Sequence, residues 1–419
     1  MLNKNNMREL AYLVRIDNIE PIEGSDNCEA AVVGGWRVMV RKGTFVPTDV
    51  AVYFEIDSHV DEENPAFAFL AKKKFAVKTQ KYTFGGKGNF ISQGLLMSAA
   101  DLGWKLVSVD AYGLHPIGML DSKGDKHLVD DESRFLTDVL KVTYHDPADN
   151  ARKAGPSQPG TSAAAFSQRH QKFCKSKIGR FLMRHRFTRT IILKLFPVKK
   201  KNGWPTWVVK TDEERCQNMP HLFVPGSDYQ NMLFWYTEKI DGTSTTFTMR
   251  RKDKKLIVCS RNVVFNNDKK SCYYDTNVYL EMAEKYNMEK KLRDILVQNP
   301  TWEFITIQAE TYGEGIQKRD YGVKGHDMAV FNVIYKEKNQ QPVRLNPDFG
   351  RTFCAVHELP YVPVIGFAKI PPSCEELLQL AGGASIIDGG MREGIVLRDN
   401  SGQVSFKAVD NEFLLKYHG

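Results

Sequence analysis

The stretch FWYTEKIDGTSTTFTMR, residues 234–250, decides how the second half of the chain is interpreted. Aromatic and β-branched residues alternate with polar ones on both sides of Lys-Ile-Asp-Gly, residues 239–242. This alternation predicts two β-strands, and Asp-Gly is typical of a tight turn between strands. Lys239 stands at the edge of that turn, where the fold alone has no need of a lysine.

The composition predicts a soluble globular protein of two or three domains, because 419 residues are too many for one ordinary core. No apolar run approaches the roughly 18 residues of a membrane span, and the first residues are not those of a signal peptide, so we expect a cytoplasmic location. The seven cysteines form no C-x-x-C pair and the ten histidines show no zinc spacing. Both observations argue for reduced thiols and against a metal held by Cys or His.

The positive charge of the chain is concentrated in one segment. No acidic residue lies between Asp149 and Asp212, an interval that carries fifteen lysines and arginines, whereas the whole chain has a net charge of +8. Residues 146–166 are rich in Pro, Gly, Ser and Ala and predict a linker, and residues 175–196 mix basic with apolar residues at roughly helical spacing. A solvated linker and a surface for a polyanion such as RNA are both consistent with this segment, residues 146–210.

The first 145 residues are predicted to form a β-barrel domain of the OB-fold type. Short runs such as CEAAVVGGWRVMVRKGTF and DVAVYFEIDSHV alternate or run apolar, with Gly, Pro and Asp between them. Small barrels with interleaved basic and aromatic residues commonly bind nucleic acid. FGGKGN, residues 84–89, lacks the spacing of a phosphate-binding loop and predicts a hairpin instead.

Residues 211–419 are predicted to form an α+β domain. Strands are expected around 233–265, 303–312, 327–335 and 393–409, with helices near 277–297 and 373–382. Lys-x-Asp-Gly by itself favours no more than a turn. Other short motifs follow it in order, however: SRN (260–262), AETYGEG (309–315), DMAVFNVI (327–334), REGIVLRD (392–399) and SFKAVDNEF (405–413).

As an ordered set these motifs resemble those of the covalent nucleotidyltransferases, which comprise polynucleotide ligases and mRNA capping enzymes. TEKIDG and the upstream KTDEERCQN (210–218) are most similar to the ATP-dependent RNA ligases, in the branch with an N-terminal OB domain. The resemblance implies an α+β nucleotidyltransferase fold that is ATP-grasp-like, with antiparallel sheets and flanking helices, preceded by the OB barrel.

The resemblance also implies the chemistry. Lys239 would attack the α-phosphorus of ATP to give lysyl-AMP, AMP would move to an RNA 5′-phosphate, and a 3′-OH would displace it, in an RNA repair reaction that needs Mg²⁺ or Mn²⁺. Glu393 would hold the hydrated cation. Lys407 would lower the pKa of Lys239 or bridge the α-phosphate. The residues expected to contact ATP or AMP are Glu238, Lys239, Ile240, Arg261, Asn262, Glu310, Phe331, Glu393, Lys407 and Arg215.

Roles are implied for several of these residues. An ionised Glu310 would accept hydrogen bonds from the ribose hydroxyls, and Arg261 with Asn262 would reach the ribose or phosphate. Phe331 would offer its ring face to the adenine, whose edge Glu238 would frame. Each also has a purely structural interpretation, since Phe331 lies in a core-like run and Glu393 with Arg398 could form a surface pair.

One position departs from the pattern. Many relatives have a second lysine two residues after the one that matches Lys407, and this chain has Val409 there. Phosphate contacts are therefore expected to be fewer, or to come from Arg398 or the basic segment.

Among the relatives, the domain order selects the class. Only twelve residues follow Lys407, too few for a further domain, whereas ligases of DNA and capping enzymes carry their OB domain there. The expected partner is RNA, as a nicked duplex or as broken ends on a DNA or RNA template, with no membrane and no obligate protein partner. The alternative is a catalytically inactive nucleotidyltransferase-like adaptor that binds nucleic acid.

Overall fold

The computed structural model describes residues 1–4, 8–84, 89–108, 116–144, 204–210, 212–265 and 276–418. Residues 146–203, which hold the predicted linker and most of the basic segment, lie outside these ranges, as does the helical spacing predicted at 175–196. Among the helices of the described part, none is both long and apolar enough to cross a membrane.

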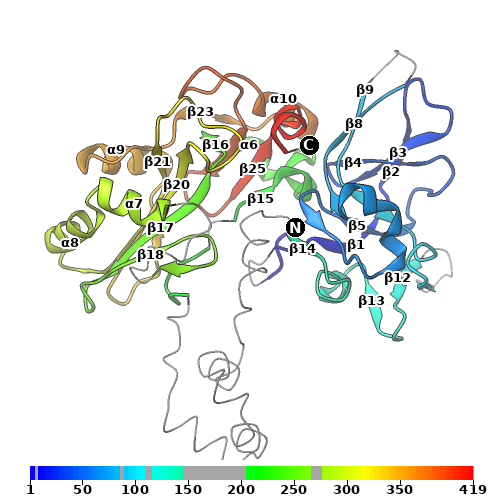
Figure 1. The fold of residues 1–419 in the computed structure, drawn as a ribbon, viewed down its shortest axis with the longest axis horizontal. Coiled ribbons are helices and arrows are strands. Elements are labelled where there is room, and N and C mark those ends of the chain that lie inside the picture. Colours follow the sequence, from blue (N-terminus) through cyan, green and yellow to red (C-terminus); the bar gives the residue numbers. More distant parts are fainter. Residues whose placement is uncertain are drawn as a thin grey trace, which may run out of the picture. The chain divides into compact units, whose positions relative to one another are not determined.

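The N-terminal domain is built around a strand that is buried on both faces. β5 (Val50–Phe54) reads VAVYF, and all of its side chains are buried. A short continuous apolar run of this kind is typical of a fully covered strand. β5 pairs antiparallel with β1 (Ala11–Arg15) and β10 (Leu95–Met97), so it is the middle strand of a three-stranded sheet (Figure 1).

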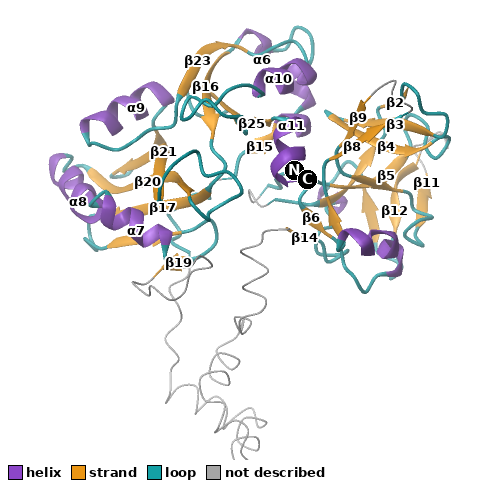
Figure 2. Ribbon diagram, turned by 45° about the horizontal axis from the view of Figure 1, so that its top comes forward, coloured by secondary structure: helices purple, strands orange, loops and turns teal. Residues whose placement is uncertain are grey.

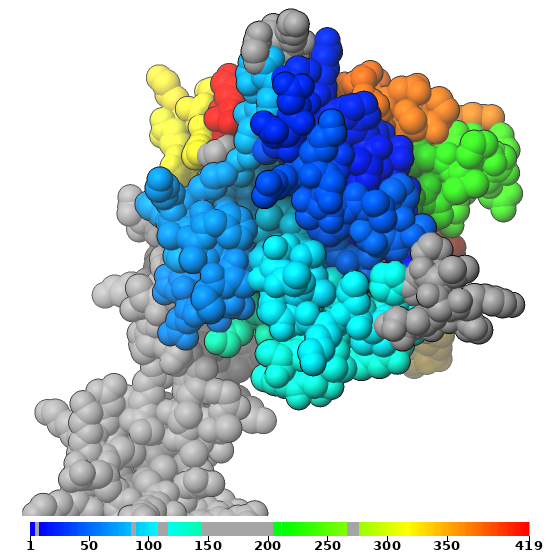
Figure 3. All heavy atoms as spheres, turned by 90° about the vertical axis from the view of Figure 1, so that its right-hand side faces the viewer, coloured from blue at the N-terminus to red at the C-terminus, as the bar shows by residue number. Residues whose placement is uncertain are grey.

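Further short strands surround this sheet. They are β2 (Asn18–Pro21), β3 (Cys28–Val33), β4 (Trp36–Arg41), β6 (Ser58–His59), β7 (Ala76–Val77), β8 (Gln80–Thr83), β9 (Asn89–Ser92), β11 (Lys105–Ser108), β12 (Pro116–Leu120), β13 (Lys126–Leu128) and β14 (Thr143–Tyr144). β8 and β9 pair antiparallel, which confirms the hairpin predicted at FGGKGN. In the space-filling view the blue N-terminal strands lie directly against the cyan last part of the domain (Figure 3).

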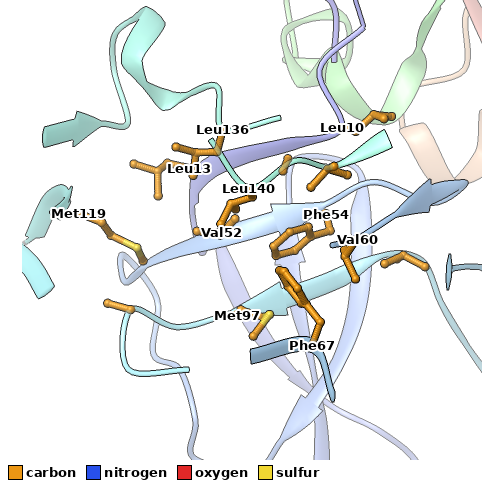
Figure 4. Close-up of a cluster of buried hydrophobic side chains, with 14 of the residues drawn as sticks. Leu10, Leu13, Val52, Phe54, Val60, Phe67, Met97, Met119, Leu136 and Leu140 are labelled. Atoms are coloured by element: carbon orange, nitrogen blue, oxygen red, sulfur yellow. The ribbon is translucent and has the colours of Figure 1, made fainter. Parts of the chain in front are cut away.

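Two apolar clusters hold this domain together, one on each side of β5. On one side the rings of Phe54 and Phe67 meet edge to face with their centroids 5.4 Å apart, and Leu13 and Val52 pack beside them (Figure 4). The other side contains Tyr53 and its neighbours. Burying one such side chain contributes about 1.5–3 kcal/mol, so the alternation along β5 stabilises both sides of the domain.

The C-terminal domain contains two mainly antiparallel sheets. The first has the order β15-β25-β24-β16-β23 and the second the order β19-β18-β17-β20-β21-β22. Their strands are β15 (Glu214–Arg215), β16 (Leu233–Lys239), β17 (Thr243–Arg250), β18 (Leu256–Cys259), β19 (Val264–Phe265), β20 (Trp302–Gly313), β21 (His326–Glu337), β22 (Val343–Arg344), β23 (Val364–Lys369), β24 (Gly394–Asp399) and β25 (Ser405–Val409). This architecture confirms the predicted α+β class.

The Asp-Gly turn joins these two sheets. The strands predicted on either side of it are present, but β16 pairs with β23 and β24, whereas β17 pairs with β18 and β20. Gly242 is required at the crossing, because a Cβ there would lie 2.4 Å from the carbonyl oxygen of Thr311. The turn therefore places Lys239 at the end of the first sheet, next to the start of the second.

Helices cover the sheets (Figure 2). They are α6 (Asp228–Asn231), α7 (Val278–Lys285), α8 (Met288–Gln298), α9 (Pro347–Val356), α10 (Cys374–Ala381) and α11 (Asn411–Phe413). The single helix predicted near 277–297 is wrong: Asn287 has a φ of 49° and separates α7 from α8. α9 and β23 were not predicted from the sequence, whereas α10 matches the helix predicted near 373–382.

Candidate active site

β16 carries the candidate nucleophile on one face and a core residue on the other. Its register with β24 is regular from Phe234 to Lys239, so alternate residues point to opposite faces. Phe234 packs against Phe406 in a buried cluster, with their ring centroids 5.6 Å apart. Lys239 is therefore on the other face, which is the face that carries Lys407 on β25.

Lys239 is in contact with Glu393. Its Nζ donates to both carboxylate oxygens of Glu393 at 2.7 Å, and the side chain of Glu393 is 9% exposed. The guanidinium of Arg392 donates to the carbonyl oxygens of Leu380, Ala381 and Gly382 at the end of α10. This fixes the backbone immediately before Glu393, so the carboxylate approaches Lys239 from a rigid segment.

The pKa of Lys239 is raised, and the expectation that it would be lowered is wrong. Burial alone lowers this pKa, but the charges of Glu393 and Glu310, with the hydrogen bonds to Glu393, outweigh burial, and Asp241 adds to them. The prediction named Lys407 as the nearby cation. The two ammonium groups do repel each other, but the carboxylates around Lys239 have the larger effect on its pKa. Lys239 is consequently an ammonium in this arrangement and must lose a proton before it can attack phosphorus.

Glu310 lies among these acids, and its pKa is raised. Burial raises its pKa to about 8, Lys239 opposes this shift, and the charges of Glu393 and Asp241 add to it. The predicted role of Glu310 toward the ribose hydroxyls stays a prediction. When protonated, its carboxyl can both donate and accept a hydrogen bond.

Lys407 and Arg215 form a basic side of the site. They are paired residues of the parallel strands β25 and β15. Burial, Arg8 and Arg215 together lower the pKa of Lys407 to about 7. The side chain of Arg215 is 7% exposed and lies 3.4 Å from Asp57, while its Nε and Nη1 have no hydrogen-bond partner among the described residues. Buried donors without partners, beside a lysine in a positive environment, fit an anionic ligand such as a phosphate.

The departure at Val409 has a structural reason. Val409 is 2% exposed and belongs to the apolar cluster that contains Tyr12 and Trp36 of the N-terminal domain. A lysine at this position would place a charge in that cluster. Arg398, suggested as a substitute, donates to Glu213 and to the carbonyl oxygen of Phe331, so it already has partners.

Arg261 is held beside the N-terminal domain. Its guanidinium lies 2.6 Å from Asp212 and 5.0 Å from the ring centroid of Tyr144. Arg8 lies 5.1 Å from the same ring centroid. Asn262 is an exposed residue of the bend that follows, and its predicted contact with the nucleotide stays a prediction.

Two of the residues predicted to contact ATP or AMP share an apolar cluster. Ile240 is 2% exposed and packs with Tyr312, Tyr321 and Ala329, and Phe331 packs against this cluster with part of its side chain accessible. Glu238 accepts hydrogen bonds from Ser385 and from the backbone N–H of Ile386, the latter at 2.8 Å. Its carboxylate thus anchors the loop before β24, and its contact with the adenine edge stays a prediction.

Several residues of this region were not predicted from the sequence, because their partners are distant in the chain. Tyr321 accepts a hydrogen bond from the backbone N–H of Asp241 at 2.7 Å, and His418 lies 3.4 Å from the Asp241 carboxylate. Tyr144 contacts Arg261 from the N-terminal domain. No local motif marks these three residues, and single tyrosines or histidines are too common in a sequence to be recognised as parts of a site.

Comparison with known proteins defines the class. The family model for RNA ligase matches residues 232–418, and a model described as an OB-fold domain matches residues 10–99. The chain therefore combines an OB-fold domain with a ligase domain of α+β type. Residues 232–418 therefore form a domain of the RNA ligase family.

Solved structures show the same fold over almost the whole length. RNA ligase from Naegleria gruberi with pyrophosphate is 24% identical, with a TM-score of 0.67, and the match covers 98% of this chain and 99% of that chain. A lysine-to-alanine variant of that ligase with ATP and manganese gives 23% identity, a TM-score of 0.66 and the same coverage. A glutamate-to-alanine variant with AMP and manganese gives 23% identity and a TM-score of 0.65, covering 98% and 99% of the two chains. A sequence search of curated proteins gave no match.

Proposed function

We propose that this RNA ligase uses ATP to join RNA 3′-OH and 5′-phosphate ends through a lysyl-AMP intermediate on Lys239, and that it acts in RNA repair. The observation that carries the proposal is the contact of Lys239 with Glu393 at 2.7 Å, inside the segment that matches the RNA ligase family. The nucleotide complexes of the Naegleria ligase, with ATP or AMP and manganese, support ATP as the substrate.

The first step is an in-line displacement at phosphorus. The neutral amine of Lys239 attacks the α-phosphorus of ATP, a P–N bond forms, and the P–O bond to the β-phosphate breaks to release pyrophosphate. The amine therefore has to give up the proton that Glu393 and Glu310 stabilise. Lys407 and Arg215 lie on the side where the phosphate oxygens gain negative charge, and there Lys407 can bind as a cation.

The remaining steps transfer AMP from Lys239 to the RNA and then release it as the RNA ends are joined. An oxygen of the RNA 5′-phosphate attacks the AMP phosphorus, the P–N bond breaks, and Lys239 is free again. The 3′-OH then attacks the 5′-phosphorus of the adenylylated RNA, and AMP leaves. Residues that bind the AMP phosphate in the first step serve the second one as well, because both act on the same phosphorus.

The carboxylate of Glu393 fits a divalent cation. It is buried beside the ammonium of Lys239, and carboxylate oxygens are ligands that Mg²⁺ accepts. No group of three or more His, Cys, Asp or Glu side chains in the described part could enclose a metal ion, which fits a cation that keeps most of its waters beside Glu393. Such a cation, when bound, supplies positive charge that favours loss of the lysine proton.

The test is intact mass after incubation with ATP and magnesium. We expect the wild type to gain the mass of one AMP and Lys239→Met to gain nothing. An adduct on both proteins would mean that another lysine is the nucleophile. No adduct on either would favour the alternative, a nucleic-acid-binding adaptor without catalytic activity, which incorporation of label from α-labelled ATP would check independently.

A further inference from the structure

Residues 409–418, here called the C-terminal strap, connect the N-terminal domain to the catalytic turn. Val409 and Leu414 are buried in the apolar cluster that contains Trp36. Gln93 donates a hydrogen bond to Asn411 at 2.8 Å, and Lys81 lies 3.3 Å from Glu412. The first part of the strap is thus fixed to the N-terminal domain by apolar packing and by polar contacts.

The strap ends at the Lys-Ile-Asp-Gly turn. The Nε2 of His418 lies 3.4 Å from Oδ2 of Asp241, and the two side chains are 30% and 7% exposed. Among the described residues this carboxylate oxygen accepts no hydrogen bond, and the imidazole is its ion-pair partner. A buried carboxylate oxygen without a counter-charge is costly, and His418 supplies one.

Asp241 lies two residues from the nucleophile on a turn with little freedom. Its backbone N–H donates to Tyr321, and the following Gly242 has no room for a Cβ. A movement of the Asp241 carboxylate away from its place would therefore also move the turn that carries Lys239. Catalytic displacement is sensitive to shifts of about 1 Å in such a group.

We propose that His418 is a positioning residue for lysine adenylylation: its imidazolium holds the Asp241 carboxylate, and the C-terminal strap carries this contact from the N-terminal domain to the catalytic turn. The role rests on the proposed function, since it concerns the step in which Lys239 attacks ATP. In this role His418 contacts neither the nucleotide nor Lys239, and it acts through Asp241.

The charge of His418 agrees with this role. Burial lowers its pKa, but the close contact with the Asp241 carboxylate and its charge outweigh burial, and the charges of Glu393 and Asp57 raise the pKa further. These acids come from the catalytic turn, from the segment before β24 and from the loop after β5. The contact with Asp241 is therefore present at low pH and is lost as the pH rises through the raised pKa.

The experiment measures single-turnover formation of the AMP adduct, with ATP and magnesium saturating, from pH 6 to pH 9. The proteins are the wild type, His418→Asn, His418→Lys and, as the control, Lys416→Ala. Lys416 is on the same turn, with its ammonium 5.0 Å from the ring centroid of Tyr417. Thermal unfolding of each protein reports whether it folds.

We expect His418→Asn to react about fivefold more slowly than the wild type at pH 6, as befits a partly exposed ion pair, and the two rates to converge toward pH 9. His418→Lys keeps its charge and should retain the rate at pH 6 and exceed His418→Asn at pH 9. Lys416→Ala should match the wild type.

A ratio of wild-type to His418→Asn rates that is the same at every pH would overturn the inference, because a merely structural role does not depend on the imidazolium. Equal rates for the two proteins would do so as well. If the wild type itself formed no AMP adduct, the proposed function would fail. If the wild type formed the adduct and His418→Asn reacted at the same rate, only the positioning role of His418 would fail.

Discussion

Lys239 Nζ and the two carboxylate oxygens of Glu393 lie 2.7 Å apart, which makes the candidate nucleophile one half of an ion pair. Burial and the neighbouring Asp241 raise the pKa of Glu393, while Lys239 lowers it, and the net direction is upward. Both partners of the pair therefore hold their protons more strongly than they would in water. Adenylylation has to break this pair, and substitution of Glu393 tests that requirement.

Glu393→Gln should reduce the rate of AMP-adduct formation roughly 100-fold or more, since it removes the charge that would hold the cation and orient the amine. The measurement is the single-turnover rate with ATP and magnesium. Glu303→Gln is the matched control. Glu303 forms a partly exposed pair with Lys336 at 2.9 Å, and its substitution should change the rate little. A Glu393→Gln protein with the wild-type rate would remove Glu393 from the mechanism.

Lys407 should make the protein more stable as the pH rises from about 7 toward 10. Its pKa falls from 10.5 to about 7 on folding, so the unfolded chain binds more protons than the native one in this window. The contribution of Lys407 to the free energy of unfolding therefore increases with pH. Comparing urea unfolding of the wild type and Lys407→Met at several pH values isolates the effect, because the methionine variant lacks it. Parallel curves for the two proteins would contradict the shift.

The same residue should take up a proton when a phosphate ligand binds near pH 8. Titration calorimetry with pyrophosphate, in buffers of different ionisation enthalpy, measures that uptake. Lys407→Arg stays charged throughout and should show less uptake than the wild type. Equal uptake by both proteins would assign the proton to another group.

Gly242→Ala should destabilise the ligase domain by about 1–3 kcal/mol, because its Cβ would meet the carbonyl oxygen of Thr311 at 2.4 Å. Urea unfolding measures the change. Gly366→Ala is the control: nothing lies within 4 Å of a Cβ there, and its effect should stay within about 0.5 kcal/mol. A fully stable Gly242→Ala protein would show that the turn has more room than the structure gives it.

The basic segment is predicted to contact RNA phosphates. Replacing Lys199, Lys200 and Lys201 by alanine should flatten the dependence of log Kd on log salt by about 0.7–0.9 for each phosphate that the protein no longer neutralises. Fluorescence anisotropy with a nicked RNA duplex measures the slope. Replacing Lys252, Lys254 and Lys255, which are exposed near the β17–β18 turn, removes the same charge elsewhere. If both triple variants changed the slope equally, only net charge would matter.

Short-range information in the sequence was sufficient for much of the fold. The alternation around Lys-Ile-Asp-Gly predicted β16 and β17, and the apolar run VAVYF belongs to the β-rich first domain that the structure contains. These features depend on a period of two residues, which the chain itself displays. Spacing did not reveal the break at Asn287, since one residue in a left-handed conformation divides an otherwise helical pattern.

The sequence by itself determined the residue types of this protein's chemistry and their order: a lysine at an Asp-Gly turn, acids and a second lysine downstream, and an OB-fold domain in front. Tertiary structure alone decided which of them meet. The lysine is paired with Glu393 and its pKa is raised, Val409 belongs to the apolar cluster of the N-terminal domain, and His418 reaches Asp241. The reason is physical: a pKa depends on burial and on charges a few ångströms away, and folding brings many of those charges together from distant positions in the chain.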